Sequence, residues 1–180
     1  SRRVAELSKR IALHLELGPE QAEEIELAGL LHDVGKIGIP DHILTKPGVL
    51  DAEERLIMMG HAVTSARIVG QHSALQNLTP LVRHHHEWYD GGGYPDGLRG
   101  ENIPIGAAII AVADAFETMT TDRVYRPKMS ISQARSELLQ GSGTQFHPRV
   151  AHALMALLEQ DRSPAWWTRL QPPWNQRFRL

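Results

Sequence analysis

The 180-residue chain contains no cysteine. This absence excludes disulfide bonds, thiolate metal sites and a cysteine nucleophile, so any bound metal must be held by nitrogen and oxygen ligands. The chain also lacks an apolar run approaching the roughly 18 residues of a membrane span, and its N-terminus lacks the features of a signal peptide. We therefore expect a cytoplasmic location and no membrane span in this segment.

An excess of charge of one sign is also missing, because the formal net charge is −2. No global basic field points to duplex nucleic acid, whereas a small anionic ligand requires only a local cluster of Lys and Arg. The apolar fraction of 42% and the charged fraction of 22% are ordinary for a globular protein. The length fits one domain with a sizeable core.

The chain divides into a body, residues 1–161, and a tail, residues 162–180, that is rich in Trp, Pro and Arg. The tail is too broken by proline for a long helix, and it carries no recognisable chemistry. The chain enters directly on a charged helical pattern, SRRVAELSKRIALHLEL, which is typical of a segment cut from a longer protein.

The body shows helical spacing of apolar residues and no useful strand alternation. The expected fold is all-α, a compact bundle of about seven helices with an irregular C-terminal tail. Asp51 and Glu54 have capping-box spacing at the start of the third helix. The expected helices are residues 4–17, 19–34, 51–69, 73–86, 103–121, 130–140 and 148–160.

The stretch from Glu87 to Pro104 is a long loop rich in Gly and Pro. A loop of this length without secondary structure is uncommon inside a compact domain, and such loops usually serve a function. We therefore expect it to be ordered and to serve a function.

The most informative motif is His32-Asp33, followed by Lys36, in LLHDVGKIGIPD. An adjacent imidazole and carboxylate at the end of an apolar helix are poor core residues and good metal ligands. The pair alone is weak evidence, but further imidazoles and a carboxylate recur in helical patterns downstream. The complete set is His32, Asp33, His61, His85, His86 and Asp114.

The set must be weighed against a purely structural explanation. A single His on an apolar helix face is more often a satisfied core residue than a ligand, and we accept that explanation for His14, His42, His72, His147 and His152. His84 stays open, because three consecutive helical residues span too wide an arc to share one metal. For the set of six, however, a structural explanation requires several coincidences, since a lone buried carboxylate such as Asp114 is costly.

Four imidazoles and two carboxylates are about what a two-metal hydrolytic centre requires. Asp33 is the natural bridging ligand, because one carboxylate can present an oxygen to each metal. The donor set suits Fe, Mn, Zn or Ni. Lys36, Arg123 and Arg126 are cations near enough in the sequence to hold substrate phosphates, although a solvated helix end explains the two arginines equally well.

Four motifs of the sequence together resemble those of a known family. HDVGKIGIPD, KPGVL with a downstream His, HHEWYDGGGYPDG and VADAFETMTTDRVYR together resemble the HD-GYP domain, a subgroup of the HD metal-dependent phosphohydrolases. The resemblance runs from about Arg3 to about Ala156. It implies a phosphodiesterase that hydrolyses cyclic di-GMP to linear pGpG, and in some members on to GMP. It also implies two or three metal ions, often iron and sometimes manganese.

Carried over by position, the resemblance makes all six residues of the set metal ligands, with Asp33 bridging. Lys36 would contact substrate and assist the leaving group or the attacking water, and Arg123 and Arg126 would bind phosphate. Gly93, Tyr94 and Pro95 form the GYP signature beside the site, and we include Tyr94 among the substrate-binding residues.

Three departures from the family pattern stand out. The family places a further His ligand just before the position of Ser1, and the sequence starts after it. Glu117 stands where Asp is usual, and His147 replaces the Asp of a Phe-Asp-Pro motif. Neither position is a ligand in the family pattern, so we expect both changes to be tolerated.

The leading hypothesis is a cyclic di-GMP phosphodiesterase of bacterial second-messenger signalling with two divalent ions, Fe or Mn, and a third ion left open. The alternatives are an HD-type phosphohydrolase that acts on another nucleotide and a non-catalytic module that senses the dinucleotide or docks a partner. The resemblance also predicts an N-terminal receiver or sensor domain in the full-length protein. A second copy of the chain or a signalling protein would be the partner.

Overall fold

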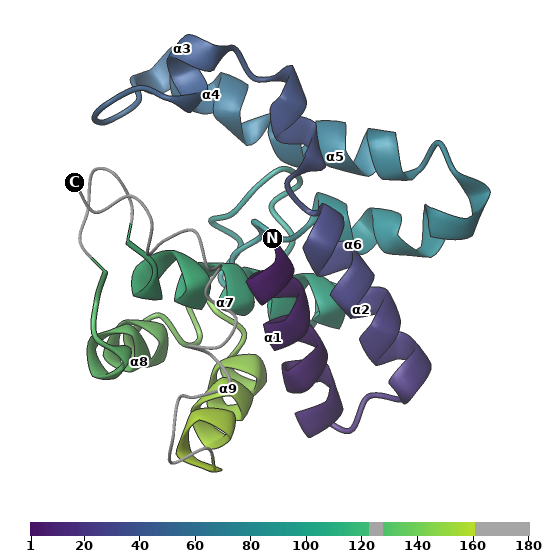
Figure 1. Ribbon diagram of the computed structural model, residues 1–180, viewed down its shortest axis with the longest axis vertical. Helices are drawn as coiled ribbons and strands as arrows, with labels where there is room; N and C mark the ends of the chain where they lie inside the picture. Colours follow the sequence, from purple (N-terminus) through teal and green to yellow (C-terminus); the bar gives the residue numbers. More distant parts are fainter. Residues whose placement is uncertain (123–127, 161–180) are drawn as a thin grey trace, which may run out of the picture.

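The computed structural model describes residues 1–122 and 128–160, and within these ranges the regular structure is entirely helical. Three short 3-10 helices, η1 to η3, accompany the α-helices (Figure 1). The elements are α1 (Arg2–His14), α2 (Pro19–Leu31), η1 (Val34–Gly38), α3 (Asp41–Leu44), α4 (Ala52–Met59), α5 (His61–Val69), η2 (Ser73–Leu78), α6 (Thr79–Arg83), η3 (Gly100–Asn102), α7 (Ile105–Thr120), α8 (Ile131–Gln140) and α9 (Pro148–Gln160). Within those ranges, no helix combines the length and the apolar character that crossing a membrane requires.

Helix α7, which corresponds to the helix expected at 103–121, is the centre of the core. Ile109, Ile110, Val112, Ala113 and Phe116 are each fully buried. Helices α1, α2, α6, α8 and α9 all contact α7, so this helix is covered on most sides (Figure 1). A helix that is apolar all round is the sequence pattern of such a central position.

Helices α1 and α2 form an adjacent pair against this core. Val4, Leu7 and Ile11 fall on one face of α1 at helical spacing, and all three are buried. The following helix begins at Pro19, where the missing N–H of proline costs nothing, and Gly18 is its N-cap. Helix α2 stops at Leu31, three residues before the predicted end, and the chain turns there into η1.

Two predicted helices are each divided in the structure. The segment 51–69 begins with the predicted capping box of Asp51 and Glu54, but it separates at Gly60 into α4 and α5. The segment 73–86 is a 3-10 helix followed by the short α6, because Pro80 has no N–H with which to continue a helix from Ser73. The first break lies directly before the predicted ligand His61.

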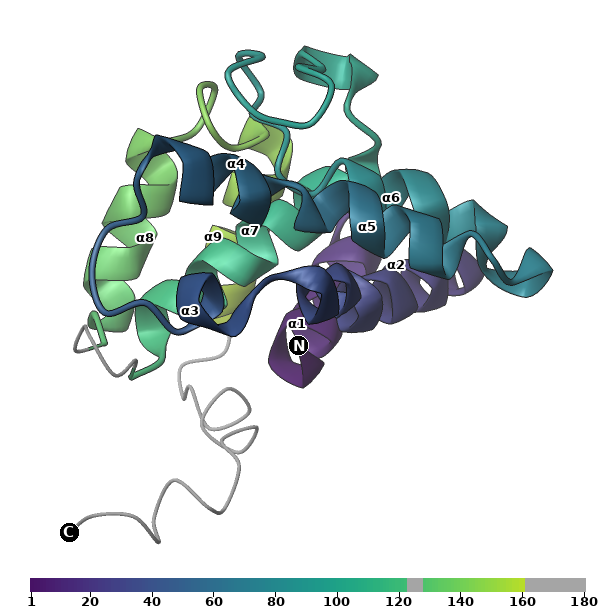
Figure 2. The same cartoon turned by 90° about the horizontal axis from the view of Figure 1, so that it is seen from above.

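The Gly- and Pro-rich segment from Glu87 to Pro104 has no regular structure apart from η3. Its backbone is bound to the α8–α9 connection by N–H groups of Tyr89 and Asp90, which donate to the carbonyl oxygens of Gln145 and Thr144 at 3.2 and 2.8 Å. Figure 2 shows the two loops side by side on one face of the molecule. The predicted tail, residues 162–180, lies outside the described residues.

Candidate metal centre

The predicted ligands come from the ends of α2 and α6, the start of α5 and the middle of α7. These elements contact one another: η1 packs on α5, α5 on α6, and α6 on α7. The structure therefore brings together all six residues of the predicted set, although they are spread over more than eighty positions of the sequence.

Three of the imidazoles are oriented by the backbone in the same way. In each, Nδ1 lies 2.7 Å from the carbonyl oxygen three residues earlier in the chain. Because a carbonyl oxygen can only accept, Nδ1 carries the proton and Nε2 presents its lone pair. The pairs are His32 with Gly29, His61 with Met58, and His85 with Val82.

Asp33 lies between two of these lone pairs. Its Oδ1 is 3.3 Å from Nε2 of His61, and its Oδ2 is 3.4 Å from Nε2 of His32. The ammonium of Lys36 donates to Oδ2 at 2.7 Å. Burial by itself would raise the pKa of Asp33, but the close contacts with His61, His32 and the Lys36 ammonium outweigh it and hold that pKa well below its usual range. The carboxylate is thus ionised, with one oxygen toward each imidazole.

His86 completes a second group with His61 and His85. Its Nε2 is 3.2 Å from Nε2 of His61. Burial, reinforced by His61, lowers the pKa of His86 to about 3. Burial, reinforced by His86, also lowers the pKa of His85 well below its ordinary value. Neutral imidazoles with free lone pairs are the form in which histidine binds metals.

Asp114 projects from α7 toward the same space, with Oδ1 3.8 Å from Nε2 of His32. Burial raises the pKa of Asp114, and the attraction of His32 offsets only part of this effect. A second carboxylate so close to Asp33 is unfavourable without a cation between them.

These residues fit divalent metal ions on three observations. Two groups, His61–His85–His86 and His32–Asp33–His85, each hold three ligand atoms within 4.8 Å of one another. Nε2 of His32, Nε2 of His85 and Oδ1 of Asp33 are buried without a hydrogen-bond partner. The Nε2 atoms of His61 and His86 are 3.2 Å apart. This is the spacing of two nitrogen ligands that bind the same metal ion with bonds of about 2.1 Å. His85 belongs to both groups, which places it between two candidate ion positions.

The 3-10 helix that carries Lys36 is held against α5 by a close approach of two backbones. The N–H of Gly35 donates to the buried Oγ of Ser65 at 2.7 Å. A Cβ added at Gly35 would lie 2.3 Å from the carbonyl oxygen of His61 and 2.4 Å from the nitrogen of Ser65. Only glycine allows this approach, which sets the position of Asp33 and Lys36 relative to His61.

The GYP signature has a comparable role on the other side of the site. A Cβ at Gly93 would lie 2.2 Å from the nitrogen of Trp88, and the N–H of Tyr94 donates to the carbonyl oxygen of His86 at 3.1 Å. The Tyr94 ring consequently stacks on the His86 imidazole, with centroids 4.8 Å apart. Burial, with the charges of Asp33 and Asp114, raises the pKa of Tyr94, so the hydroxyl keeps its proton.

Sequence reasoning missed Glu87, which fastens the loop. This carboxylate is buried and accepts hydrogen bonds from the backbone N–H groups of Asp96 and Leu98 at 2.8 and 3.1 Å. Arg83 binds Asp96 through two hydrogen bonds of 2.8 Å. Nδ1 of His84 lies 3.5 Å from the carboxylates of both Glu87 and Asp96. This histidine therefore faces the loop and not the predicted ligand set. The available signal was an acidic residue directly between the three histidines and the Gly-rich segment.

The remaining histidines do not join the six. His42, His72 and His152 are exposed, and His14 is half-buried at the end of α1. His147 is buried, with Nε2 3.4 Å from Glu101 and its ring against Tyr89, so it supports the loop from the outside. Arg123 and Arg126 lie outside the described residues. Glu117 is paired with Arg3 of α1, which joins α7 to the start of the chain.

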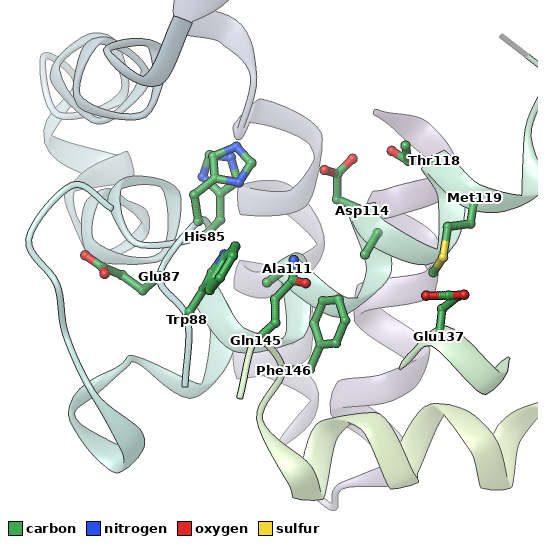
Figure 3. Close-up of a pocket in the computed structure, with 12 residues that line it drawn as sticks. His85, Glu87, Trp88, Ala111, Asp114, Thr118, Met119, Glu137, Gln145 and Phe146 are labelled. Atoms are coloured by element: carbon green, nitrogen blue, oxygen red, sulfur yellow. The ribbon is translucent and has the colours of Figure 1, made fainter. Parts of the chain in front are cut away.

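A pocket of about 330 Å³ opens beside the six residues (Figure 3). His85, His86 and Asp114 form one part of its lining. The opposite part consists of side chains outside the predicted ligand set. They are Trp88, Ala111, Ala115, Thr118, Met119, Glu137, Gln145 and Phe146, and Glu87 also lines the pocket.

Comparison with known proteins agrees with this geometry. The family described as HD domain matches residues 1–150. The chain is 41% identical over 157 residues to a cyclic di-GMP phosphodiesterase of Thermotoga maritima. The aligned region covers 86% of this chain and 43% of that protein. It is 39% identical over 163 residues to the cyclic di-GMP phosphodiesterase response regulator RpfG of Xanthomonas campestris. Here the aligned region covers 88% of this chain and 43% of the relative.

A solved structure shows the same fold. The crystal structure of a cyclic GMP-AMP specific phosphodiesterase of Vibrio cholerae superimposes with a TM-score of 0.72 at 18% sequence identity, over 95% of this chain and 45% of the other. The chain therefore spans less than half the length of these relatives.

Proposed function

This chain belongs to the HD-domain family, and from that premise we propose that it is a metal-dependent phosphodiesterase that hydrolyses cyclic di-GMP to linear pGpG, and further to GMP. One observation carries the proposal: two groups of buried ligand atoms share His85, and Asp33 lies across the space between His32 and His61. Relatives named cyclic di-GMP phosphodiesterases support the choice of substrate.

The site is proposed to hold two divalent ions, Fe or Mn, with a third left open. His61 and His86 would hold one ion and His32 and Asp114 the other, with Asp33 shared and His85 within reach of both ligand groups. Bound ions of this kind polarise a phosphoryl oxygen and lower the pKa of a bound water. The absence of thiolates from the chain leaves only the hard and borderline donors that suit Fe and Mn.

Lys36 is the proposed catalytic partner of Asp33. Its ammonium is 2.7 Å from the Asp33 carboxylate and about one-third exposed, so it can reach a phosphate in the site while still held in place. From that position it would donate toward the departing 3′-oxygen. Tyr94 would donate a hydrogen bond from its hydroxyl to substrate, since its raised pKa keeps the hydroxyl protonated. Arg123 and Arg126, outside the described residues, are proposed to bind the non-scissile phosphate.

The direct test is turnover of cyclic di-GMP by purified protein supplied with Mn²⁺ or Fe²⁺. We expect pGpG as the first product by chromatography, and a loss of at least about 100-fold in kcat for Asp33→Asn and His61→Ala. His152→Ala is the matched control, because this exposed histidine, among the residues that the structure describes, bonds only to the carbonyl oxygen of Pro148. Metal content of each variant shows whether the loss follows the ions.

One rival substrate is favoured by a specific observation, since a relative from Vibrio cholerae that is 39% identical over 155 residues is named a 3′3′-cGAMP-specific phosphodiesterase. A panel of cyclic di-GMP, 3′3′-cyclic GMP-AMP and cyclic di-AMP separates the two possibilities by kcat/KM. A protein that binds metal and cyclic di-GMP without hydrolysing it would instead be the non-catalytic sensing module.

The setting of the domain is also proposed. Because the chain spans 43% of relatives that include a response regulator, we propose an N-terminal receiver or sensor domain in the full-length protein. A homodimer or a signalling partner would then transmit the signal, in the cytoplasm where such dinucleotides act. We propose residues 1–161 as the phosphohydrolase domain and residues 162–180 as an extension.

A further inference from the structure

The pocket beside the predicted metal centre has walls that the proposed chemistry does not use. Its floor is α7, where Ala111 and Ala115 are small enough to leave a hollow. Phe146 and Met119 add apolar surface, and Figure 3 shows Trp88 on one side and Glu137 on the other. A volume of about 330 Å³ is at the lower end for small-molecule sites, so the pocket suits one nucleoside unit and not a whole cyclic dinucleotide.

Trp88 is a large aromatic side chain left exposed, at 41%, next to a cluster of functional residues. A Cβ at Gly92 would lie 3.2 Å from Cε3 of its indole, so the loop backbone supports the six-membered ring. The ring therefore has a supported position and an accessible surface. Stacking on such a surface is a common way to bind a nucleobase, because every base has a π-face.

Glu137 and Gln145 bring polar groups to the same pocket without an evident structural use. Both side chains are exposed, and neither makes a hydrogen bond or an ion pair with another residue of 1–122 or 128–160. A carboxylate only accepts hydrogen bonds, whereas an amide both donates and accepts. Glu137 can therefore distinguish bases by their donors, and Gln145 can serve any base.

We propose that this pocket takes one guanine base of the substrate, stacked on Trp88 and read by the Glu137 carboxylate. The inference rests on the proposed function and adds its base specificity. Guanine presents two adjacent donors, N1–H and the N2 amino group, which match the two oxygens of a carboxylate. Adenine presents an acceptor, N1, at the corresponding place, and the carboxylate would repel it.

The location of the pocket connects base recognition to the reaction. His85, His86 and Asp114 belong both to the predicted ligand set and to the pocket lining. A nucleoside seated in the pocket consequently leaves its attached phosphate beside the ligand set. Glu137 acts at the far end of the same substrate unit and is a specificity residue, not a metal ligand.

The test uses GMP and AMP as probes, because neither contains a phosphodiester bond to hydrolyse. Calorimetry with the Mn²⁺-loaded protein should show a preference for GMP of about tenfold or more. Glu137→Gln should reduce this preference to within about twofold, since the amide accepts and donates equally well. The exposed Glu23→Gln on α2 removes the same charge elsewhere and should keep the wild-type preference.

A second variant tests the stacking surface. Trp88→Ala should weaken GMP and AMP binding by a similar factor, about tenfold, while Trp88→Phe retains most of the affinity. Unchanged melting temperatures for the Glu137 and Trp88 variants would show that each protein is folded. A Trp88→Ala protein that binds both nucleotides as tightly as wild type would overturn the stacking.

The results separate this inference from the proposed function. If cyclic di-GMP is hydrolysed but Glu137→Gln leaves the GMP preference unchanged, the pocket assignment is wrong and the function stands. If cyclic di-GMP is not hydrolysed but the GMP preference depends on Glu137, the pocket assignment stands and the function is wrong. A wild-type protein that binds AMP as well as GMP overturns the guanine assignment.

Discussion

Replacing Gly35 by alanine is expected to disturb the metal centre without removing a ligand. The new Cβ would lie 2.3 Å from the carbonyl oxygen of His61, whereas ordinary contacts begin at 3.4 Å. Relieving the contact requires η1 to move away from α5 by about 1 Å, because the opposing atoms are backbone and cannot rotate aside. That movement carries Asp33 and Lys36 away from His61.

The expected magnitudes follow from this displacement. Overpacking of this kind costs about 1–3 kcal/mol, and the strained hydrogen bond from Gly35 to Ser65 adds about 1 kcal/mol. For a chain of this size, the sum corresponds to a fall in melting temperature of roughly 5–15 °C. A displacement of about 1 Å in a reacting geometry can lower the rate by about 100-fold.

The matched control is Gly38→Ala in the same 3-10 helix. Its Cβ would meet only Cγ2 of Thr64, at 3.9 Å, so we expect stability and activity close to wild type. Thermal melting, metal content after dialysis and turnover of cyclic di-GMP should be measured for both variants. The reasoning fails if Gly35→Ala melts, binds metal and turns over like Gly38→Ala.

Three further predictions concern other parts of the molecule. Glu87→Ala should lower the free energy of unfolding by about 2–4 kcal/mol, because two backbone N–H groups of the loop lose their acceptor. Glu87→Gln keeps one acceptor oxygen and should lose less stability. Equal losses for the two variants in denaturant titrations would contradict the argument. Leu154→Ala should cost about 2–5 kcal/mol, since this residue is fully buried, whereas the exposed Leu139→Ala should change stability by under about 0.5 kcal/mol; similar melting curves would refute the assignment of the core. Removal of metal with EDTA should lower the melting temperature and added Mn²⁺ should restore it, because the ions bind only the folded protein; a melting temperature indifferent to both treatments would count against a metal centre.

The sequence predicted the last two helices of the body closely. Residues 148–160 are helical as expected, and the helix expected at 130–140 begins at Ile131 behind the Ser130 cap. The segment 51–69 was wrongly expected to be continuous, since a single glycine inside a helical pattern is tolerated and does not by itself predict a break. That the segment is helical was therefore predictable, and its division at Gly60 was not.

The ligand set was predictable because buried polar residues in apolar helices are conspicuous. The residues around it were not, because their roles depend on contacts between distant segments. Gly35 is an ordinary glycine in the sequence, and only its approach to His61 shows why it is needed. Trp88 and Glu137 lie almost fifty positions apart, and no local pattern indicates that they line one pocket.

The backbone carbonyl oxygens that hold His32, His61 and His85 have a consequence for how such a centre changes over time. Since these acceptors belong to the main chain, a change of side chain at Met58 or Val82 does not remove them, whereas a Cβ at Gly29 would lie 3.1 Å from Cα of Ala5 and press on α1. The proton position on the three rings is thus inherited with the helix geometry. An engineer who wishes to retune these ligands has no partner side chain to exchange and must alter the helix ends themselves.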